Sequence, residues 1–429
     1  MRHSPPRRST RLWTLVVSRQ KGINTRKFHN ATGCEGVVAV VLAAIILMSD
    51  YAFGANSTNV YPGQDGKLTY YQDARGNRIP DFSIAGYKGG GVAIPDAPVV
   101  RTLEPTGGDD TQRIKDAMAW VVANVPLGQN GIRGAILLKR GVYKVSTVIT
   151  IDESGIVIRG EGNNGAGTII KHVGKAQAAT FSIGGGSLRS SLVTEIDQNY
   201  VAVGAATFKV KNAQTLSVGQ QILIRLTPTQ KWVDDLMLTG EWLPQNREIK
   251  WYRAITAVDY VNNTITISSG ITSQIDIGNG YATAKIEFIT QNTLVNNVGV
   301  EDLILMSDYD RSKKDANGYF VDENHAKTGI YFYTGRDNWV RRVTGFFYWF
   351  SLIDAYSGSS NITVEDCGML DGVSLDTPKT HAGARDYYFS INGAQILVQR
   401  CYGRNGRHTF VMNSQGTTST VFLDWRAQG

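Results

Sequence analysis

Short apolar blocks separated by turn-forming residues dominate the chain after about residue 130. Blocks such as GAILLKRGVYKV and GIVIRGEG are rich in the β-branched and aromatic residues that favour strands. One earlier segment, 111–125, has the period of a helix instead, and Pro126 ends it. Its apolar stripe consists of Ile114, Met118, Val121, Val122 and Val125. The pattern predicts an all-β fold with one amphipathic helix near its beginning.

Five similar segments recur in the last third of the chain: VEDL, VRRV, VEDC, VQRC and FLDW. Their first residues are Val300, Val340, Val364, Val398 and Phe422, with spacings of 40, 24, 34 and 24 residues. The two spacings of 24 suggest a basic unit, with loops inserted into the other two. Repeats of this length indicate a solenoid, and strand-only units indicate a parallel β-helix whose equivalent residues stack at about 4.8 Å. Cys367 and Cys401 would then form an inward-facing ladder.

The segment 190–290 has a different pattern, in which apolar and polar residues alternate between short turns. This pattern predicts a small antiparallel β-subdomain inserted between coils of the main fold. The predicted division of the chain is 1–55, a signal peptide or N-terminal anchor; 56–98, an extended segment; 99–189, the cap and first coils; 190–290, the insert; and 291–429, further coils without a C-terminal cap.

Positive charge is concentrated at the N-terminus. Residues 1–55 contain eight Lys and Arg against two acidic residues, and the remaining 36 basic and 35 acidic residues leave a net charge of +1. The body of the chain therefore shows no charge pattern typical of nucleic-acid binding. The apolar run VVAVVLAAIILM is short for a membrane span and typical of a signal-peptide core. We predict a secreted, periplasmic or extracellular protein with no membrane contact beyond this leader, and a retained anchor is the alternative.

Several motifs of this chain are similar to those of known β-helix proteins: GDDTQRIKDAM, GVYKV, GIVIRGEG, VEDC and VQRC. Through them the chain resembles the pectate-lyase-like superfamily, and IPDFSIAGYKGGG, DENHA, WVRRVTG and GRHTF resemble secreted bacterial and fungal members. The resemblance implies a right-handed parallel β-helix with an N-terminal capping α-helix. Lyases, hydrolases, epimerases and non-catalytic tailspikes share that scaffold, so the resemblance implies the fold more firmly than the activity. The GHG motif of polygalacturonase-type hydrolases is absent.

Cationic and aromatic residues precede or begin the same predicted strand in successive coils. Trp349 precedes one strand, Arg385 and Tyr387 lie at the next, and Arg407 and His408 lie at the third. Stacking would place them along one groove, although solvated strand ends or structural ion pairs are the alternative. Elimination at a uronate needs a cation at the carboxylate and a base at C5, which arginine and histidine suit. The predicted catalytic residues are Arg407, His408 and Arg385, and the predicted substrate contacts are Tyr387, Trp349, Arg404 and His325.

A second candidate lies in the acidic segment SDYDRSKKDANGYFVDENHA, in which Asp322 and Glu323 are oxygen ligands of the type that Ca²⁺ prefers. The spacing fits no EF-hand, and a charged surface loop is the alternative interpretation. Ca²⁺ is the only cofactor that the sequence suggests.

Together these patterns predict a secreted carbohydrate-active protein, most specifically a polysaccharide lyase that cleaves an acidic, uronate-containing polysaccharide by β-elimination. A glycoside hydrolase, an epimerase and a non-catalytic carbohydrate-binding protein or adhesin on the same scaffold are the alternatives.

Overall fold

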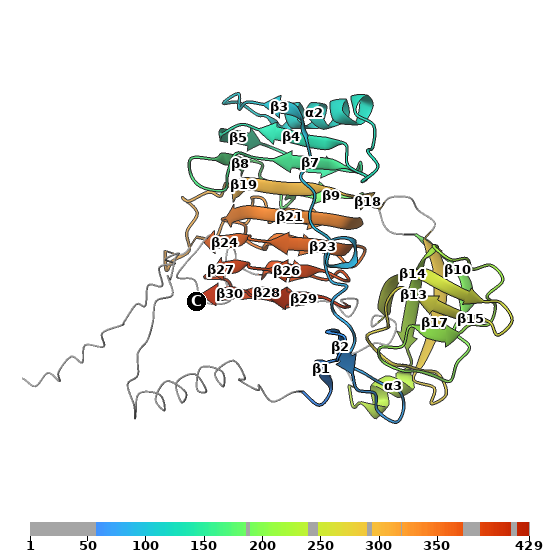
Figure 1. Cartoon of the computed structure of the whole chain (residues 1–429). Coiled ribbons are helices and arrows are strands. Elements are labelled where there is room, and N and C mark those ends of the chain that lie inside the picture. The colour runs from blue at the N-terminus through green and yellow to red at the C-terminus, as the bar shows by residue number, and fades with distance from the viewer. Residues whose placement is uncertain are drawn as a thin grey trace, which may run out of the picture. The chain divides into compact units, whose positions relative to one another are not determined.

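Most strands of this protein lie in parallel sheets, to which successive segments of the chain return (Figure 1). The computed structural model describes residues 57–185, 189–238, 248–289, 294–318, 320–371, 387–412 and 418–428. The leader predicted over 1–55 lies outside these residues. Within the described ranges, no helix is both long and apolar enough to cross a membrane.

The largest sheet has 14 strands arranged in two rows. In stacking order, the first row consists of β3 (Val99–Leu103), β4 (Gly134–Leu138), β7 (Ile156–Arg159), β19 (Gly299–Ser307), β21 (Gly335–Phe346), β23 (Ser360–Glu365), β26 (Leu397–Gln399) and β29 (Val421–Leu423). Val300, Val340, Val364, Val398 and Phe422 occupy the same register position on five of these strands. This register confirms the alignment of the repeat that the sequence predicted.

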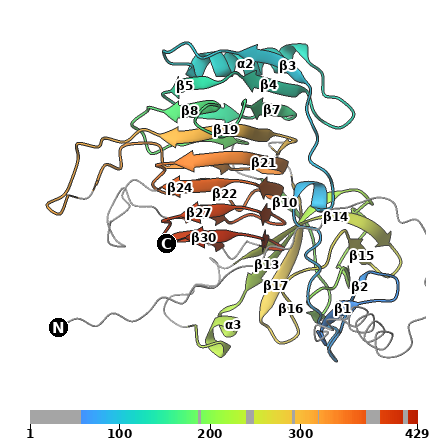
Figure 2. The same cartoon turned by 60° about the vertical axis from the view of Figure 1, so that its left-hand side comes forward.

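The second row and a separate six-stranded sheet continue the same stacking order. Figure 2 shows the second row from another side. The second row consists of β5 (Gly141–Val145), β8 (Thr168–His172), the later parts of β19 and β21, β24 (Gly368–Asp371), β27 (Tyr402–Arg404) and β30 (Arg426–Gln428). The six-stranded sheet consists of β6 (Ile149–Ile151), β9 (Ala179–Ile183), β20 (Thr328–Phe332), β22 (Ser351–Ala355), β25 (Tyr387–Ile391) and β28 (His408–Met412).

One hydrophobic core joins the two rows and the six-stranded sheet. Branched aliphatic and aromatic residues from successive levels of the stack are buried in it, including Ile158, Phe181, Val340 and Phe389, and Phe410 and Phe422 of the last level pack against it partly buried. The helix α2 (Thr111–Asn124) adds its buried stripe to the same core, at the end of the stack where β3 and β4 lie (Figure 1). Burying each large apolar side chain contributes about 1.5–3 kcal/mol, so α2 is held mainly by this packing.

The two cysteines of the body are free thiols, and both are buried in the core. Each directly precedes a strand of the second row, and Gly368 and Tyr402, the residues that follow them, are register partners. Cys367 and Cys401 therefore occupy equivalent positions on neighbouring levels, as predicted. Burial raises the pKa of the Cys367 thiol well above its ordinary value.

Charged residues of alternating sign form a ladder where the chain bends from the first row into the second. Arg342 donates two hydrogen bonds to the carboxylate of Asp302, at 2.5 and 2.7 Å, and Arg400 donates two to Asp366, at 2.7 and 2.9 Å. All five bend residues have a left-handed backbone: Asp302, Arg342, Asp366, Arg400 and Asp424. Arg400, one of several cations in the VQRC segment, thus takes part in a structural ion pair.

The segment 190–289 forms an antiparallel sheet with its own core, which contains the fully buried Trp251. The strand order is β10 (Ser190–Glu195), β17 (Ala282–Ile289), β13 (Gln221–Pro228), β14 (Ile249–Asp259), β15 (Thr264–Ile267) and β12 (Thr207–Lys209). The remaining elements are β1 (Val60–Pro62), β2 (Leu68–Tyr70), the 3-10 helix η1 (Tyr87–Gly89), β11 (Tyr200–Val201), α3 (Gln230–Asp235), β16 (Ile275–Asp276) and β18 (Val295–Asn296).

A buried arginine links this insert to the parallel stack. Arg253, on β14, donates a hydrogen bond of 2.8 Å to the side-chain oxygen of Gln395 and a second of 2.9 Å to the carbonyl of Ser269. Tyr252 donates from its hydroxyl to the carbonyl of Ser357 at 3.2 Å. Burial lowers the pKa of Arg253 to about 10, and its oxygen partners satisfy a guanidinium that would otherwise be costly to bury.

Candidate functional site

Four connections from the second row to the six-stranded sheet lie on one side of the stack. They follow β8, β19, β21 and β27 and precede β9, β20, β22 and β28, strands that occur in the same order in both sheets. Inserted loops in repeat architectures gather on one face, which is often the binding face. The described residues of these connections are 173–178, 308–318, 320–327, 347–350 and 405–407, and together they form what we call the loop corner.

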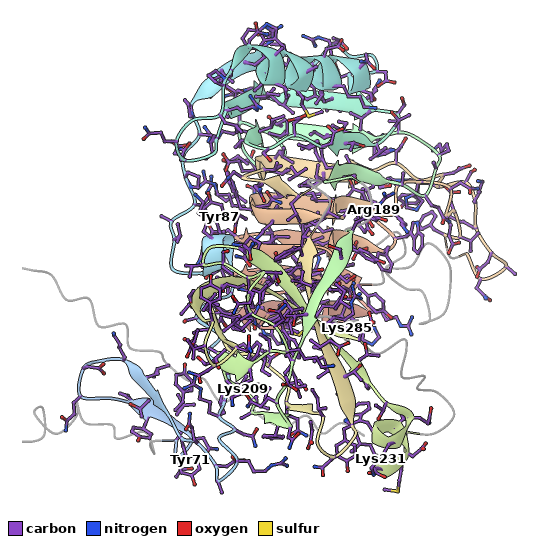
Figure 3. All side chains as sticks on the ribbon, turned by 90° about the vertical axis from the view of Figure 1, so that its right-hand side faces the viewer. Tyr71, Tyr87, Arg189, Lys209, Lys231 and Lys285 are labelled. Carbon is purple, nitrogen blue, oxygen red and sulfur yellow. The ribbon has the colours of Figure 1, made fainter. Side chains whose placement is uncertain are left out.

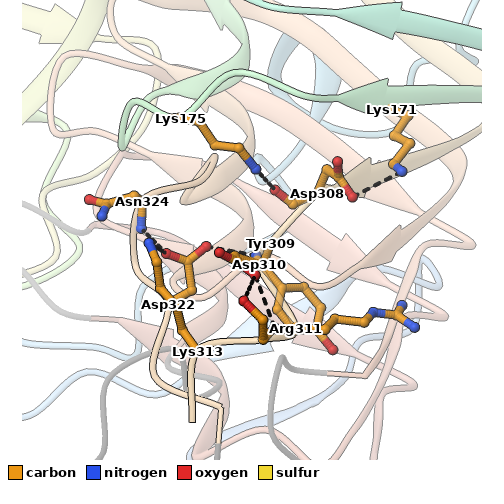
Figure 4. A pocket seen from close by; sticks show the side chains of 10 residues that line it. Lys171, Lys175, Asp308, Tyr309, Asp310, Arg311, Lys313, Asp322 and Asn324 are labelled. Atoms are coloured by element: carbon orange, nitrogen blue, oxygen red, sulfur yellow. Dashed lines mark hydrogen bonds and ion pairs between the residues drawn. The ribbon is translucent and has the colours of Figure 1, made fainter.

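The loop corner contains a cavity of about 920 Å³ (Figure 4). Four of its lining residues are cationic, three are acidic and one is a tyrosine. The lining consists of Lys171, Lys175, Asp308, Tyr309, Asp310, Arg311, Ser312, Lys313, Asp322 and Asn324. The long connection between β19 and β20 supplies most of them, which explains why the repeat spacing increases there.

Two of the four cations in this cavity are already paired with carboxylates. Lys171 lies 2.9 Å from Asp308, and Lys313 lies 2.9 Å from Asp322. Lys175 is exposed and donates to the backbone carbonyl of Asp308 at 3.2 Å. Two cavity cations, Lys175 and the exposed Arg311, therefore remain without a carboxylate partner among the described residues.

Arg311 is held by aromatic rings. Its guanidinium carbon lies 5.3 Å from the ring centroid of Tyr309 and 5.5 Å from that of Phe347. Phe320 packs edge-on against the same tyrosine at 5.4 Å. Stacking on rings orients a guanidinium and leaves its N–H edge available for hydrogen bonds to an anion. Arg311 is thus a preorganised cation in the lining of the cavity.

The carboxylate of Asp322 is occupied by protein donors. It accepts hydrogen bonds from the amides of Asp310, at 2.8 Å, and Asn324, at 3.2 Å, in addition to Lys313. Burial opposes its ionisation, but these bonds outweigh that effect and hold its pKa below the ordinary value. Glu323 is half-buried beside it. No group of three or more acidic, histidine or cysteine side chains converges in the described ranges, so calcium binding here stays a prediction.

His325 lies beneath the cavity and is fully buried. Its Nδ1 is 2.7 Å from the hydroxyl of Ser307, and its ring centroid is 5.9 Å from that of Tyr309. Burial lowers the pKa of His325 to about 4, so the imidazole is neutral at physiological pH. The structure therefore places this predicted substrate contact behind the cavity wall, where it supports Tyr309.

Further aromatic residues lie at the edge of the loop corner, where β22, β25 and β28 begin. Tyr387 and His408 are register partners on β25 and β28, with ring centroids 5.3 Å apart. Phe350 lies 5.6 Å from Tyr387 and 5.9 Å from Trp349. Three of the predicted site residues are thus brought into one continuous row, which we call the aromatic row.

The predicted arginines have different surroundings. Arg407 is exposed and directly precedes His408. Arg404 is exposed and donates from Nε to the carbonyl of Leu370 at 3.2 Å. Arg385 lies outside the described residues.

Phe350, Lys175 and Arg311 are absent from the residues predicted from the sequence. A sequence signal for Phe350 exists in the repeat. Phe350 directly precedes β22, so its position is equivalent to the one directly before Tyr387 on β25. Lys175 and Arg311 could not be found by aligning the repeats, because the connections in which they lie differ in length from one coil to the next.

Comparisons with known proteins find distant structural matches only. No family model and no curated protein matches the chain. Among solved structures, the tailspike of Escherichia coli bacteriophage HK620 in complex with a pentasaccharide is 12% identical, covers 90% of this chain and 46% of its own, and has a TM-score of 0.35. The tailspike gp49 of Pseudomonas phage LKA1 is 14% identical, with coverages of 72% and 48% and a TM-score of 0.34.

A protein described as a putative glycosyl hydrolase from Parabacteroides merdae is 8% identical, covers 76% of this chain and 96% of its own, and has a TM-score of 0.34. The chain thus spans about half the length of the two tailspikes. Identities and TM-scores this low transfer no activity to this chain.

Proposed function

We propose that this chain is a secreted carbohydrate-active protein that binds an acidic polysaccharide along the loop corner and cleaves it by β-elimination. The observation that carries the proposal is the cavity of about 920 Å³ with Lys175 and Arg311 in its lining, on the side of the stack where the aromatic row also lies. Cations without carboxylate partners fit the uronate carboxylates, and ring faces fit the apolar faces of the sugars.

The length of this surface suits an oligosaccharide. The aromatic row spans β22, β25 and β28, and the cavity loop leads into β20, one level earlier. Neighbouring parallel strands lie about 4.8 Å apart, so β20 and β28 are separated by roughly 14 Å. A ligand of several sugar units would therefore contact the cavity cations at one end and His408 at the other.

The proposed reaction removes the proton at C5 of a uronate and breaks the bond between C4 and its glycosidic oxygen. The electron pair of the C5–H bond forms the C4–C5 double bond, and the departing oxygen takes up a proton. A guanidinium at the carboxylate stabilises the negative charge that develops during proton removal. We assign this role to Arg407 together with Arg385, and the role of base to His408, whose imidazole is exposed at the end of the aromatic row.

We propose that the two rows and the six-stranded sheet are the faces of a right-handed parallel β-helix and that α2 caps its N-terminal end. The uniform parallel register and the shared core support this arrangement, and crossovers between parallel strands are right-handed in almost all proteins.

The experiment is an incubation of the full-length secreted protein with polygalacturonate, alginate and glycosaminoglycans. Release of unsaturated uronate ends, detected by ultraviolet absorbance, is the expected result. New reducing ends without this absorbance would show a hydrolase instead, and binding without any product would show a non-catalytic protein. N-terminal sequencing of the exported protein tests secretion, with a start between residues 53 and 58 expected.

A further inference from the structure

A second group of aromatic residues lies on the six-stranded sheet, at the ends of β20 and β22 that point away from the loop corner. Tyr333 directly follows β20 and Tyr356 directly follows β22, and their rings stack at 5.5 Å with an interplanar angle of 6°. Tyr331 joins them, 5.7 Å from Tyr333 and 6.2 Å from Tyr356. Tyr356 is 47% exposed, so part of this tyrosine platform is accessible to a ligand.

A carboxyl group lies beside the platform. Asp354 is the register partner of Tyr331 on one side and of Ser390 on the other. It forms side-chain hydrogen bonds with Ser390 and Asn392. Burial raises the pKa of Asp354 to about 6, against the opposing effect of Lys327. A carboxyl group close to its pKa is present in both forms, so around pH 6 Asp354 can either donate a hydrogen bond to a sugar hydroxyl or accept one from it.

A small cavity of about 190 Å³ adjoins the platform where the insert meets the stack. Tyr333, Tyr356 and Ser357 line it from the stack, and Arg225 and Lys250 are among the residues that line it from the insert. Both cations are already neutralised by carboxylates.

Arg225 lies 2.9 Å from Glu287 and 2.5 Å from Glu248, and Lys250 lies 3.6 Å from Glu248. In contrast to Arg311 at the loop corner, these cations are not available to an anionic ligand. The charges of this cavity therefore favour a neutral occupant.

We propose that Tyr331, Tyr333 and Tyr356, with Asp354 and the adjoining cavity, form a second saccharide-binding site, which takes an uncharged pyranose unit. The stacked rings would contact the apolar face of the sugar, and Asp354 and Ser357 would hydrogen-bond its hydroxyls. The site stands on its own residues and does not require lyase activity at the loop corner.

The test measures binding of the full-length protein to an array of neutral and acidic oligosaccharides. At least one neutral oligosaccharide is expected to bind, and Tyr356→Ala is expected to weaken that binding about tenfold, the loss that corresponds to one ring contact. Tyr71→Ala is the matched control, because Tyr71 is 58% exposed and lies on the N-terminal segment (Figure 3). Tyr356→Phe keeps the ring and should keep most of the affinity.

Failure of this site is distinguishable from failure of the proposed function. Tyr356→Ala should leave binding of acidic oligosaccharides unchanged, whereas Arg311→Ala should weaken only those. The proposal is overturned if the unmodified protein binds no neutral oligosaccharide, or if Tyr356→Ala binds neutral ligands as tightly as the unmodified protein. Unaltered thermal unfolding of each variant verifies that it is folded.

Discussion

Nε of Arg341 lies 2.5 Å from Oε2 of Glu301, the residue directly opposite it on the neighbouring parallel strand. On the other side of Glu301, Nε of Arg159 lies 2.5 Å from Oε1. The indole N–H of Trp339, which lies on the same strand as Arg341, donates to Oε2 at 3.1 Å. The side chain of Glu301 is fully buried. Three levels of the stack are therefore joined by one carboxylate whose charge two guanidinium groups compensate.

The first prediction concerns this carboxylate. Glu301→Gln removes the negative charge and leaves two largely buried guanidinium groups near each other, so it should lower the free energy of unfolding by about 3 kcal/mol or more. Urea denaturation measures the loss. Asp366→Asn is the control, because its ion pair with Arg400 is much more exposed and should contribute about 1 kcal/mol or less. Equal losses in the two variants would contradict the stabilising role of the buried Glu301 carboxylate between its two guanidinium groups.

The second prediction concerns acid stability. Burial lowers the pKa of both His172 and His325 from 6.5 to about 4. In the unfolded chain each imidazole takes up a proton as the pH falls through its ordinary pKa, whereas in the folded protein each stays neutral until about pH 4. The free energy of unfolding should therefore decrease between pH 6.5 and pH 4, by up to about 3 kcal/mol for each histidine.

Urea midpoints at pH 7 and pH 4.5 measure this dependence. His325→Gln should be less stable than the unmodified protein at pH 7 but should lose less stability on acidification. Ser351→Ala, which removes another buried polar group, should keep the full pH dependence. An unchanged pH dependence in His325→Gln would show that this imidazole is not held neutral.

The third prediction concerns Asp354. Its pKa is raised from 3.8 to about 6 by burial, so in the folded protein it keeps its proton where the unfolded chain has lost it. This group therefore lowers the free energy of unfolding as the pH rises from about 4 to 6. Asp354→Asn should stabilise the protein at pH 7.5, by up to about 3 kcal/mol, and should have little effect at pH 4. Thermal unfolding at the two pH values measures this, and stabilisation of equal size at both would contradict it.

The repeat was predictable from the sequence because a valine stands at the same position in each of four coils, shortly before the bend that joins the two rows of strands. These residues are Val300, Val340, Val364 and Val398. The spacing of apolar residues also predicted α2 and the antiparallel insert, since this spacing differs between a helix and a strand and is read over neighbouring residues. The stacking of Tyr387 on His408 followed from the same alignment.

Contacts across connections of unequal length were not predictable in this way. The cavity depends on a long loop between β19 and β20, and nothing in the repeat indicates that Arg311 returns to Tyr309 and Phe347. The acidic residue Asp322 suggested a metal ligand, whereas the fold supplies amide donors and Lys313 to it. Asp354 was missed because an aspartate in a strand shows neither its burial nor its partners.

The fourth prediction concerns the residues assigned to catalysis. Arg407 and His408 are both exposed, so Arg407→Ala and His408→Ala should leave the melting temperature nearly unchanged. Loss of a transition-state interaction of about 3 kcal/mol lowers turnover roughly a hundredfold. Initial rates of unsaturated product formation measure the effect. Normal rates with a large loss of stability would show that these residues hold the stack together instead.

The most direct test of the account is the affinity of the full-length protein for an acidic polysaccharide, measured at low salt by titration calorimetry. The double variant Lys175→Ala, Arg311→Ala removes the two cavity cations that have no carboxylate partner among the described residues. Lys209→Ala is the control, because it removes an exposed cation of the insert (Figure 3). The account predicts a loss of affinity of about tenfold or more in the double variant and none in the control. Equal affinity of all three proteins would contradict an anion-binding site at the loop corner.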